Sequence, residues 1–327
     1  MSANICFISC HYFGFQAVTG ILASEQFKMK ELTIPLVISL NQTKKSSTVG
    51  FYDFDDVAAQ YKIETIHIDS IKRPELVEII TEAKPDYLLI IGWSELAPAS
   101  ILDIPKKVND SHIRHSNTHG CIGMHPTLLP EGRGRAPIPW TIIKGLRETG
   151  VTAFLLEDSA DAGGIIFQER IQIKKEETAT TLFSKVGEAH YQLAKKISPI
   201  LAGRLLHSVK QDLSKGSVWP KRTPRDGIID FNEKANSINK LIRALTNPFP
   251  GAFFYYEGHK IIVNEIKINF KKHSKPFGTI VAVSSNGLPT IAVKDGVIEC
   301  LSISPETLYL SFKPGTKAQG KHELKIT

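Results

Sequence analysis

The chain has 327 residues, enough for two domains of ordinary size, and 42% hydrophobic with 22% charged residues indicate a globular protein. Its net charge of +7 is spread along the chain, which disfavours a nucleic-acid-binding protein and suits a small anionic substrate. The start resembles no signal peptide, and no apolar stretch reaches the ~18–20 residues that span a membrane. We therefore expect a cytoplasmic protein.

Over the first 200 residues, short apolar runs alternate with helix-like segments. Strands are expected over 5–10, 33–40, 65–68, 87–91, 121–124, 151–156 and 165–173, and helices over 74–83 and 179–206. Such runs, buried on both faces and separated by helices, predict an α/β fold with a mostly parallel sheet. Ligands of these sheets bind beyond the carboxyl ends of the strands. There we expect His11, the segment Gly92-Trp93-Ser94 and His125, because each follows directly after a run.

After the second of these helices the composition changes. Residues 214–226 are rich in Pro, Gly, Ser and basic side chains, which is typical of a linker, and a short helix is expected over 235–245. From residue 252 onward, short apolar runs separated by glycine turns indicate a small barrel of about five strands. We predict an α/β domain over 1–206, a linker over 207–226 and an OB-like β domain over 227–327.

Two kinds of site are disfavoured. No GxGxxG follows the first strand and no GxxxxGK[ST] occurs, so a glycine loop holding a pyrophosphate is not expected. His112, His115, His119 and His125 fall within fourteen residues, but Gly120 and the following strand break any shared helix face. Because no Cys or acid completes a ligand set, we predict no metal and take a solvated loop as the alternative.

The densest chemical signal is the segment 123–140, GMHPTLLPEGRGRAPIPW. A histidine directly after a strand, followed by prolines, glycines and two arginines, predicts a rigid loop with fixed cations, although a structural loop with a surface histidine would also fit. The segment 157–164, EDSADAGG, is an acidic turn between two apolar runs. Strand, loop, helix and strand would place it in the neighbouring crossover, beside His125. A carboxylate there would orient the imidazole, although turn acids often only cap their own backbone.

At these residues the chain resembles the folate-dependent formyltransferases, which include methionyl-tRNA formyltransferase and the sugar-nucleotide N-formyltransferases. The family pattern is Asn-x-His-x-Ser-Leu-Leu-Pro, an Arg-Gly loop, and an Asp in a glycine turn. The matching stretches are residues 125–130, 133–137, 148–152, 160–163, 226–231, 242–245 and 248–253. The resemblance covers nearly the whole chain, and it implies a Rossmann-like formyltransferase fold followed by the family's C-terminal module.

The resemblance also implies the chemistry. An amine would attack the formyl carbon of N10-formyltetrahydrofolate, with His125, held by Asp161, acting as general base or as an imidazolium that stabilises the oxyanion. The folate would be bound by Ile91, Gly92, Trp93, Ser94, Glu157 and Asp158. The acceptor would be bound by His11, Tyr12, Thr127, Arg133 and Arg135, arginine being suited to phosphate. Trp93 could equally be a half-buried core aromatic.

One position departs from the family pattern. The asparagine two residues before the histidine, taken to hold the formyl oxygen, is Gly123 here. We expect a main-chain N–H or a nearby side chain to supply the missing donor. The alternative is a homologue that kept folate or nucleotide binding and lost turnover.

The acceptor is predicted from the segment after the second strand. Methionyl-tRNA formyltransferases carry a basic, glycine-rich insertion there, whereas this chain has only residues 41–50, NQTKKSSTVG, with two lysines and no arginine. We therefore favour the amine of a nucleotide-linked sugar used for surface polysaccharide over initiator tRNA. The sequence specifies neither the sugar, its nucleotide nor an oligomeric state, and a homodimer is compatible with it.

Overall fold

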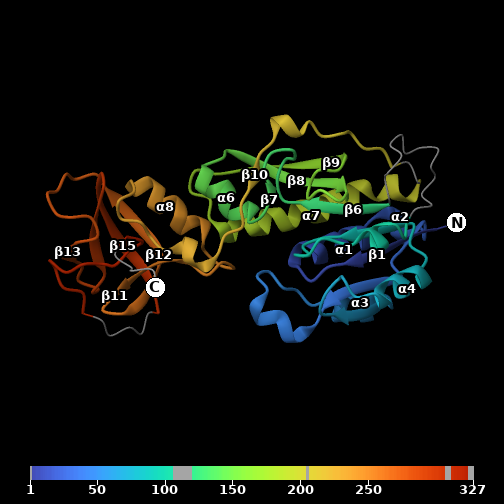
Figure 1. Ribbon diagram of the computed structural model, residues 1–327, viewed down its shortest axis with the longest axis horizontal. Helices are drawn as coiled ribbons and strands as arrows, with labels where there is room; N and C mark the ends of the chain where they lie inside the picture. The colour runs from blue at the N-terminus through green and yellow to red at the C-terminus, as the bar shows by residue number, and fades with distance from the viewer. Residues whose placement is uncertain (1, 106–119, 204–205, 306–310, 323–327) are drawn as a thin grey trace. The chain divides into compact units, whose positions relative to one another are not determined.

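The computed structural model describes residues 2–105, 120–203, 206–305 and 311–322 (Figure 1). It divides into two compact units, which are described separately. The first comprises residues up to 137, then 148–172 and 183–220. The second comprises 138–147, 173–182 and the chain from 221 onward. None of the described helices is long and apolar enough to cross a membrane.

A mainly parallel sheet forms the first unit and confirms the predicted α/β fold. Its strand order is β4-β3-β1-β5-β6-β8-β9, and a short strand, β2, also pairs with β1. The strands are β1 (Ala3–Ile8), β2 (Leu32–Thr33), β3 (Leu36–Leu40), β4 (Glu64–Ile68), β5 (Tyr87–Ile90), β6 (Cys121–His125), β8 (Glu148–Leu155) and β9 (Ile165–Gln172). The expected run over 33–40 is split at Pro35, which has no N–H to donate to a neighbouring strand.

Helices connect and flank these strands. They are α1 (Tyr12–Leu22), α2 (Glu25–Lys28), α3 (Asp55–Tyr61), α4 (Glu75–Glu82), α5 (Ala99–Leu102) and α7 (Ala179–Ala202), with 3-10 helices η1 (Gln42–Ser47) and η2 (Leu213–Lys215). His11 caps α1, its Nδ1 accepting from the Phe13 N–H at 3.1 Å. A Cβ on Gly20 would lie 2.4 Å from the Tyr191 carbonyl oxygen. The glycine therefore allows α1 and α7 to pack closely.

The last two strands of this sheet correct one prediction. We expected the turn at 157–164 to lie in a parallel crossover, but β8 runs antiparallel to β6 and pairs Thr152 with His125. The turn therefore begins beside the start of β6, where the Leu156 N–H donates to the Cys121 carbonyl. Seven of the eight β8 residues are buried, so burial gave no sign of the strand's direction.

The second unit is built on a five-stranded antiparallel sheet, which agrees with the strand number expected for the C-terminal region (Figure 1). Its order is β11-β12-β15-β14-β13, and α8 (Ala235–Ala244) contacts β12 and β15. The strands are β11 (Ala252–Tyr256), β12 (His259–Asn269), β13 (Ile280–Val283), β14 (Pro289–Val293) and β15 (Gly296–Ser304). Ile242, Phe254, Ile291 and Ile298 belong to one buried core, so this unit has its own apolar centre. Helix α6 (Pro137–Lys144) and the 3-10 helix η3 (Pro224–Gly227) are further described elements.

Candidate active site

His125 is the last residue of β6 and is 7% exposed. Its Nε2 lies 2.8 Å from the carbonyl oxygen of Gly132, and its Nδ1 lies 3.5 Å from Oδ1 of Asp161. A carbonyl oxygen can only accept, so Nε2 carries a proton. With a carboxylate facing Nδ1, both ring nitrogens point at acceptors. This arrangement suits an imidazolium held in one orientation.

Asp161 reaches the ring from a turn that folds back along β6. Its backbone lies in the left-handed region, with φ 55°, which is uncommon for a residue other than glycine. The Gly134 N–H donates to Asp161 Oδ2 at 2.8 Å, leaving Oδ1 towards His125. Gly163 allows this tight turn, because a Cβ there would lie 1.8 Å from the Leu155 carbonyl oxygen. The predicted pairing of His125 with Asp161 is therefore present in the structure, although by a different route of the chain.

The loop after His125 is held by the two antiparallel strands. Thr152 of β8 donates from Oγ1 to the Thr127 carbonyl at 2.7 Å and accepts from the Leu129 N–H at 3.1 Å. Gln168 of β9 donates from Nε2 to the Leu129 carbonyl and to Thr152 Oγ1, both at 2.9 Å. These hydrogen bonds are of the kind that the predicted rigid loop needs, and the side chains that form them lie outside the motif.

Two arginines follow in the short strand β7 (Arg133–Gly134) and the residue after it. Arg135 is exposed and donates from Nη1 to the Ser94 carbonyl at 3.2 Å, so the arginine loop meets the 91–94 loop. Arg133 is half-buried and donates to the Leu213 carbonyl at 3.3 Å. Thr127 is only 1% exposed. Arg135 is therefore better placed than Thr127 to meet a ligand in this conformation.

The 91–94 loop lies against His11. A Cβ on Gly92 would lie 2.4 Å from His11 Cβ, so glycine allows this close approach. Gly92 and Ser94 are exposed, whereas Trp93 is half-buried, packs against the apolar core and donates from Nε1 to Glu95 at 3.2 Å. Trp93 is thus in large part a half-buried core aromatic, the alternative that the sequence left open. Glu157 and Asp158, also expected to meet the folate, are exposed on the Asp161 turn.

An aromatic cluster surrounds His11 on its helix side. Tyr12 stacks on Phe183, with ring centroids 5.6 Å apart, and His11 lies 5.7 Å from the same ring. Burial lowers the pKa of the His11 imidazole to about 4. His11 is therefore neutral at pH 7 and can offer a hydrogen bond, not a positive charge, to an acceptor.

A further buried histidine lies on α7. His190 of α7 is fully buried, stacks on Phe13 with centroids 4.7 Å apart, and donates from Nδ1 to the Val186 carbonyl at 2.7 Å. Burial lowers its pKa to about 3, with smaller effects from His11 and His125. A proton on His190 would therefore repel a charge on either of the two site histidines.

The surroundings of Gly123 are apolar. Gly123 and His125 share one face of β6, since they are two residues apart. The three atoms closest to a Cβ built on Gly123 are side-chain carbons of Leu156 and Phe154, at 2.8–2.9 Å. The immediate surroundings of a Cβ at residue 123 are thus hydrocarbon, and the expected hydrogen-bond donor is not among these three nearest atoms.

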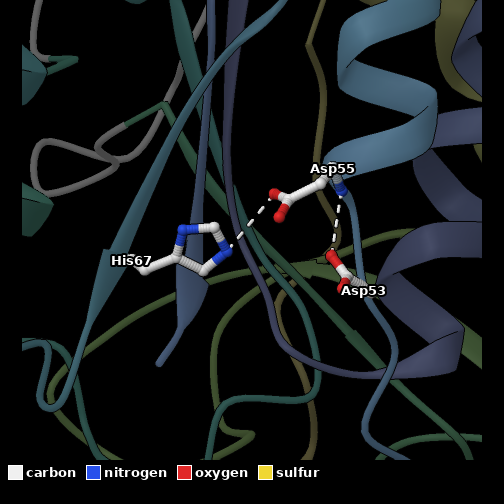
Figure 2. A group of neighbouring side chains, drawn as sticks. All are labelled: Asp53, Asp55 and His67. Atoms are coloured by element: carbon white, nitrogen blue, oxygen red, sulfur yellow. Dashed lines mark hydrogen bonds and ion pairs between the residues drawn. The ribbon is translucent and has the colours of Figure 1, made fainter. Parts of the chain in front are cut away.

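Two features lie apart from these residues. An open groove of about 630 Å³ between α1 and α3 is lined by Phe15, Tyr52 and Tyr61, among others, and contains none of the predicted site residues. Asp53 also lines this groove, and Figure 2 shows it gathered with Asp55 and His67. His67 Nε2 lies 3.3 Å from Asp55, and Asp53 accepts from the Asp55 N–H at 3.0 Å and from Gln42. These contacts pair the three side chains with one another and with neighbours at the start of α3. The histidines proposed and rejected as zinc ligands, His112, His115 and His119, lie outside the described residues.

Comparison with known proteins decides the family. Residues 5–197 match the family model for formyl transferase, and residues 221–308 match the model for the formyl transferase C-terminal domain. The chain belongs to the formyl transferase family. Members of this family are folate-dependent formyl transferases, which places His125 and Asp161 in an enzyme fold of known reaction type.

Individual relatives differ in their acceptors. The chain is 28% identical to a methionyl-tRNA formyltransferase of Syntrophomonas wolfei, over 92% of this chain and 90% of that protein. It is 31% identical to the bifunctional polymyxin resistance protein ArnA of Wigglesworthia glossinidia brevipalpis, over 72% of this chain and 34% of ArnA. An N-formyltransferase of Helicobacter canadensis, solved with folinic acid and dTDP-3-aminofucose, shares the fold with a TM-score of 0.62 at 16% identity, over 91% of this chain and 98% of that one.

Proposed function

We propose that this chain transfers the formyl group of N10-formyltetrahydrofolate to the amino group of a nucleotide-linked amino sugar. The observation that carries the proposal is the His125 ring, fixed between Asp161 and Gly132 at the end of a central strand. The 91–94 loop and Arg135 meet beside the same segment. Folate and acceptor would thus be bound by loops that follow β1, β5 and β6.

The reaction needs charge stabilisation and proton transfer. The amine nitrogen attacks the formyl carbon, and a tetrahedral oxyanion forms. The bond from that carbon to N10 of the folate then breaks, the amine loses a proton, and N10 gains one. Because both of its ring nitrogens face acceptors, His125 is better arranged to stabilise the oxyanion as a cation than to remove a proton in this conformation. To do so, the Nε2–H would have to break its hydrogen bond with the Gly132 carbonyl and donate to the formyl oxygen instead.

The choice of a nucleotide sugar is supported by the segment after β3. Residues 42–47 form the short helix η1, and the Lys44 ammonium is held by Asp69 at 3.5 Å. One of the two lysines of this segment is thus paired with an acid and the segment contains no arginine, so Lys45 is the cation that it presents to a nucleic acid. Arg135, which is exposed beside the 91–94 loop, is suited to the diphosphate of a nucleotide sugar.

A tRNA acceptor is the second candidate, favoured by the match to the Syntrophomonas methionyl-tRNA formyltransferase over nearly the whole length of both chains. A third candidate, a folate- or nucleotide-binding homologue without turnover, is favoured by the apolar filling next to Gly123. The three differ in what stabilises the protein and in whether a formylated product forms.

The test is a panel of UDP-, GDP- and dTDP-linked amino sugars, each with and without folinic acid. A ligand at about 100 times its Kd should add ~2.7 kcal/mol to the free energy of unfolding, and the melting temperature should rise. Mass spectrometry should then find a formylated sugar when N10-formyltetrahydrofolate is supplied. Salt-sensitive binding of initiator tRNA with no response to any nucleotide sugar would favour the second candidate. Stabilisation without product would favour the third.

A further inference from the structure

The segment 211–219, expected from the sequence to be part of a linker, contacts both groups that hold the His125 ring. It contains η2 and the short strand β10 (Val218–Trp219), which pairs in parallel with β7. All of these residues lie in the first unit. The segment therefore belongs to the surroundings of the site.

Gln211 forms one end of this segment. Its Nε2 donates to the carbonyl oxygens of Asp161 at 2.9 Å and Gly163 at 2.6 Å. The side chain is 6% exposed, and within the described part of the chain its Oε1 has no hydrogen-bond partner. Rotating the amide by half a turn would set its oxygen against two carbonyl oxygens, so the amide N–H donors must face the turn. Both donors of one buried amide are thus used on the turn that carries Asp161.

Ser217 and Trp219 form the other end. Ser217 Oγ accepts from the Gly132 N–H at 3.2 Å and donates to Glu131 at 2.6 Å. The Arg133 N–H donates to the Ser217 carbonyl, and the Arg135 N–H donates to the Trp219 carbonyl, both at 3.0 Å. The indole of Trp219 also covers Gly132, where a Cβ would lie 2.8 Å from the ring. These contacts fix the residue whose carbonyl accepts from His125.

We propose that segment 211–219 is a positioning strap that sets the orientation of the His125 ring, with Gln211 as the positioning residue on the Asp161 side. Asp161 has a left-handed backbone, which is uncommon for non-glycine residues although Asp adopts it more readily than most, so contacts from outside the turn help to hold it. Gln211 supplies such contacts through two carbonyls of the same turn. The proposal rests on the proposed function only in assuming that this orientation serves formyl transfer.

The experiment compares full-length Gln211→Met with wild type. Methionine keeps the length and burial of the side chain but has no N–H donor. Gln192→Met is the matched control, because the hydrogen bond that Gln192 donates within the described part of the chain goes to Glu188 on α7. Formyl transfer gives kcat and the KM of the folate donor. Protein labelled with ¹⁵N-histidine gives the ring N–H signal of His125, identified by its absence from His125→Ala.

We expect Gln211→Met to lower kcat ~10- to 100-fold with little change in KM, as misplacement of a catalytic group does. The His125 N–H signal should disappear through exchange with water, while Gln192→Met behaves as wild type. A variant that keeps both the wild-type kcat and the His125 signal overturns the proposal.

Two further outcomes keep the proposal separate from the proposed function. If wild type transfers no formyl group but Gln211→Met still loses the His125 signal, the proposed function fails and the strap stands. If Gln211→Met does not fold, Ser217→Ala decides, because it acts on the Gly132 side of the same ring. Loss of the His125 signal in folded Ser217→Ala supports the strap, and an unchanged signal contradicts it.

Discussion

The His125 ring is enclosed by the protein on two sides, with a carboxylate at Nδ1 and a main-chain carbonyl at Nε2. Replacing His125 with alanine removes the ring that, in the proposed reaction, stabilises the oxyanion from between these two groups. We predict a ~10²- to 10⁴-fold fall in the rate of formyl transfer, with the melting temperature close to that of wild type. His259→Ala, an exposed position on β12, is the control. Retention of more than half the wild-type rate would refute the assignment.

A second residue-scale prediction concerns His190. Its pKa is about 3 in the folded protein against 6.5 for an ordinary histidine, so below pH 6.5 the unfolded chain binds a proton that the folded chain does not. The free energy of unfolding should therefore decrease as the pH is lowered, and this group should contribute a loss of about 2 kcal/mol between pH 7 and pH 5. Urea titrations at several pH values measure it. His190→Gln should be less stable at pH 7 and show a shallower pH dependence; an unchanged slope would contradict the prediction.

Gly123 of β6 lies against Phe154 of β8 and against Leu156, the residue that follows β8. A methyl group at this position would meet Leu156 and Phe154 at 2.8–2.9 Å, which is too close for ordinary contact. We expect Gly123→Ala to lower the free energy of unfolding by ~1–3 kcal/mol. Leu156→Ala should relieve part of that loss, so a double-mutant cycle should give a coupling energy different from zero. Strictly additive effects would mean that Leu156 does not occupy this space in solution.

The same elements show how far the sequence could lead. Continuous burial of β1, β3 and β5 predicted the parallel sheet, and the spacing of His125 and Asp161 agreed with a family pattern. The direction of β8 could not be predicted, because a buried strand has the same composition whichever way it runs. The carbonyl of Gly132 carries no sequence signal, since every residue has one. Gln211, an isolated polar residue in coil, was indistinguishable from a linker residue.

At the scale of the whole molecule, the four cysteines are distributed over both units. All four are free and buried, and burial raises the pKa of the thiol of Cys10 to about 11 and those of Cys6 and Cys300 to about 12. The thiolate is the reactive form, so a thiol reagent should label none of them in the native protein and all four in guanidinium chloride. The dependence of the labelling rate on the denaturant concentration then reports the opening of the unit that contains each cysteine. Rapid labelling of a cysteine in the native state would show that its unit opens locally.

The strap contacts join residues far apart along the chain: Gly132 and Ser217 are separated by 85 positions. Contacts between residues this far apart carry a loop-closure cost and cannot form before the later residue has been synthesised, and N-terminal segments fold first during synthesis. A nascent chain could therefore complete the parallel sheet and present both His125 and Asp161 before residues 211–219 had left the ribosome. Catalytic competence would be acquired in a separate, later step than the fold. The nascent enzyme would thus be inactive until residues 211–219 had been synthesised and had formed their contacts.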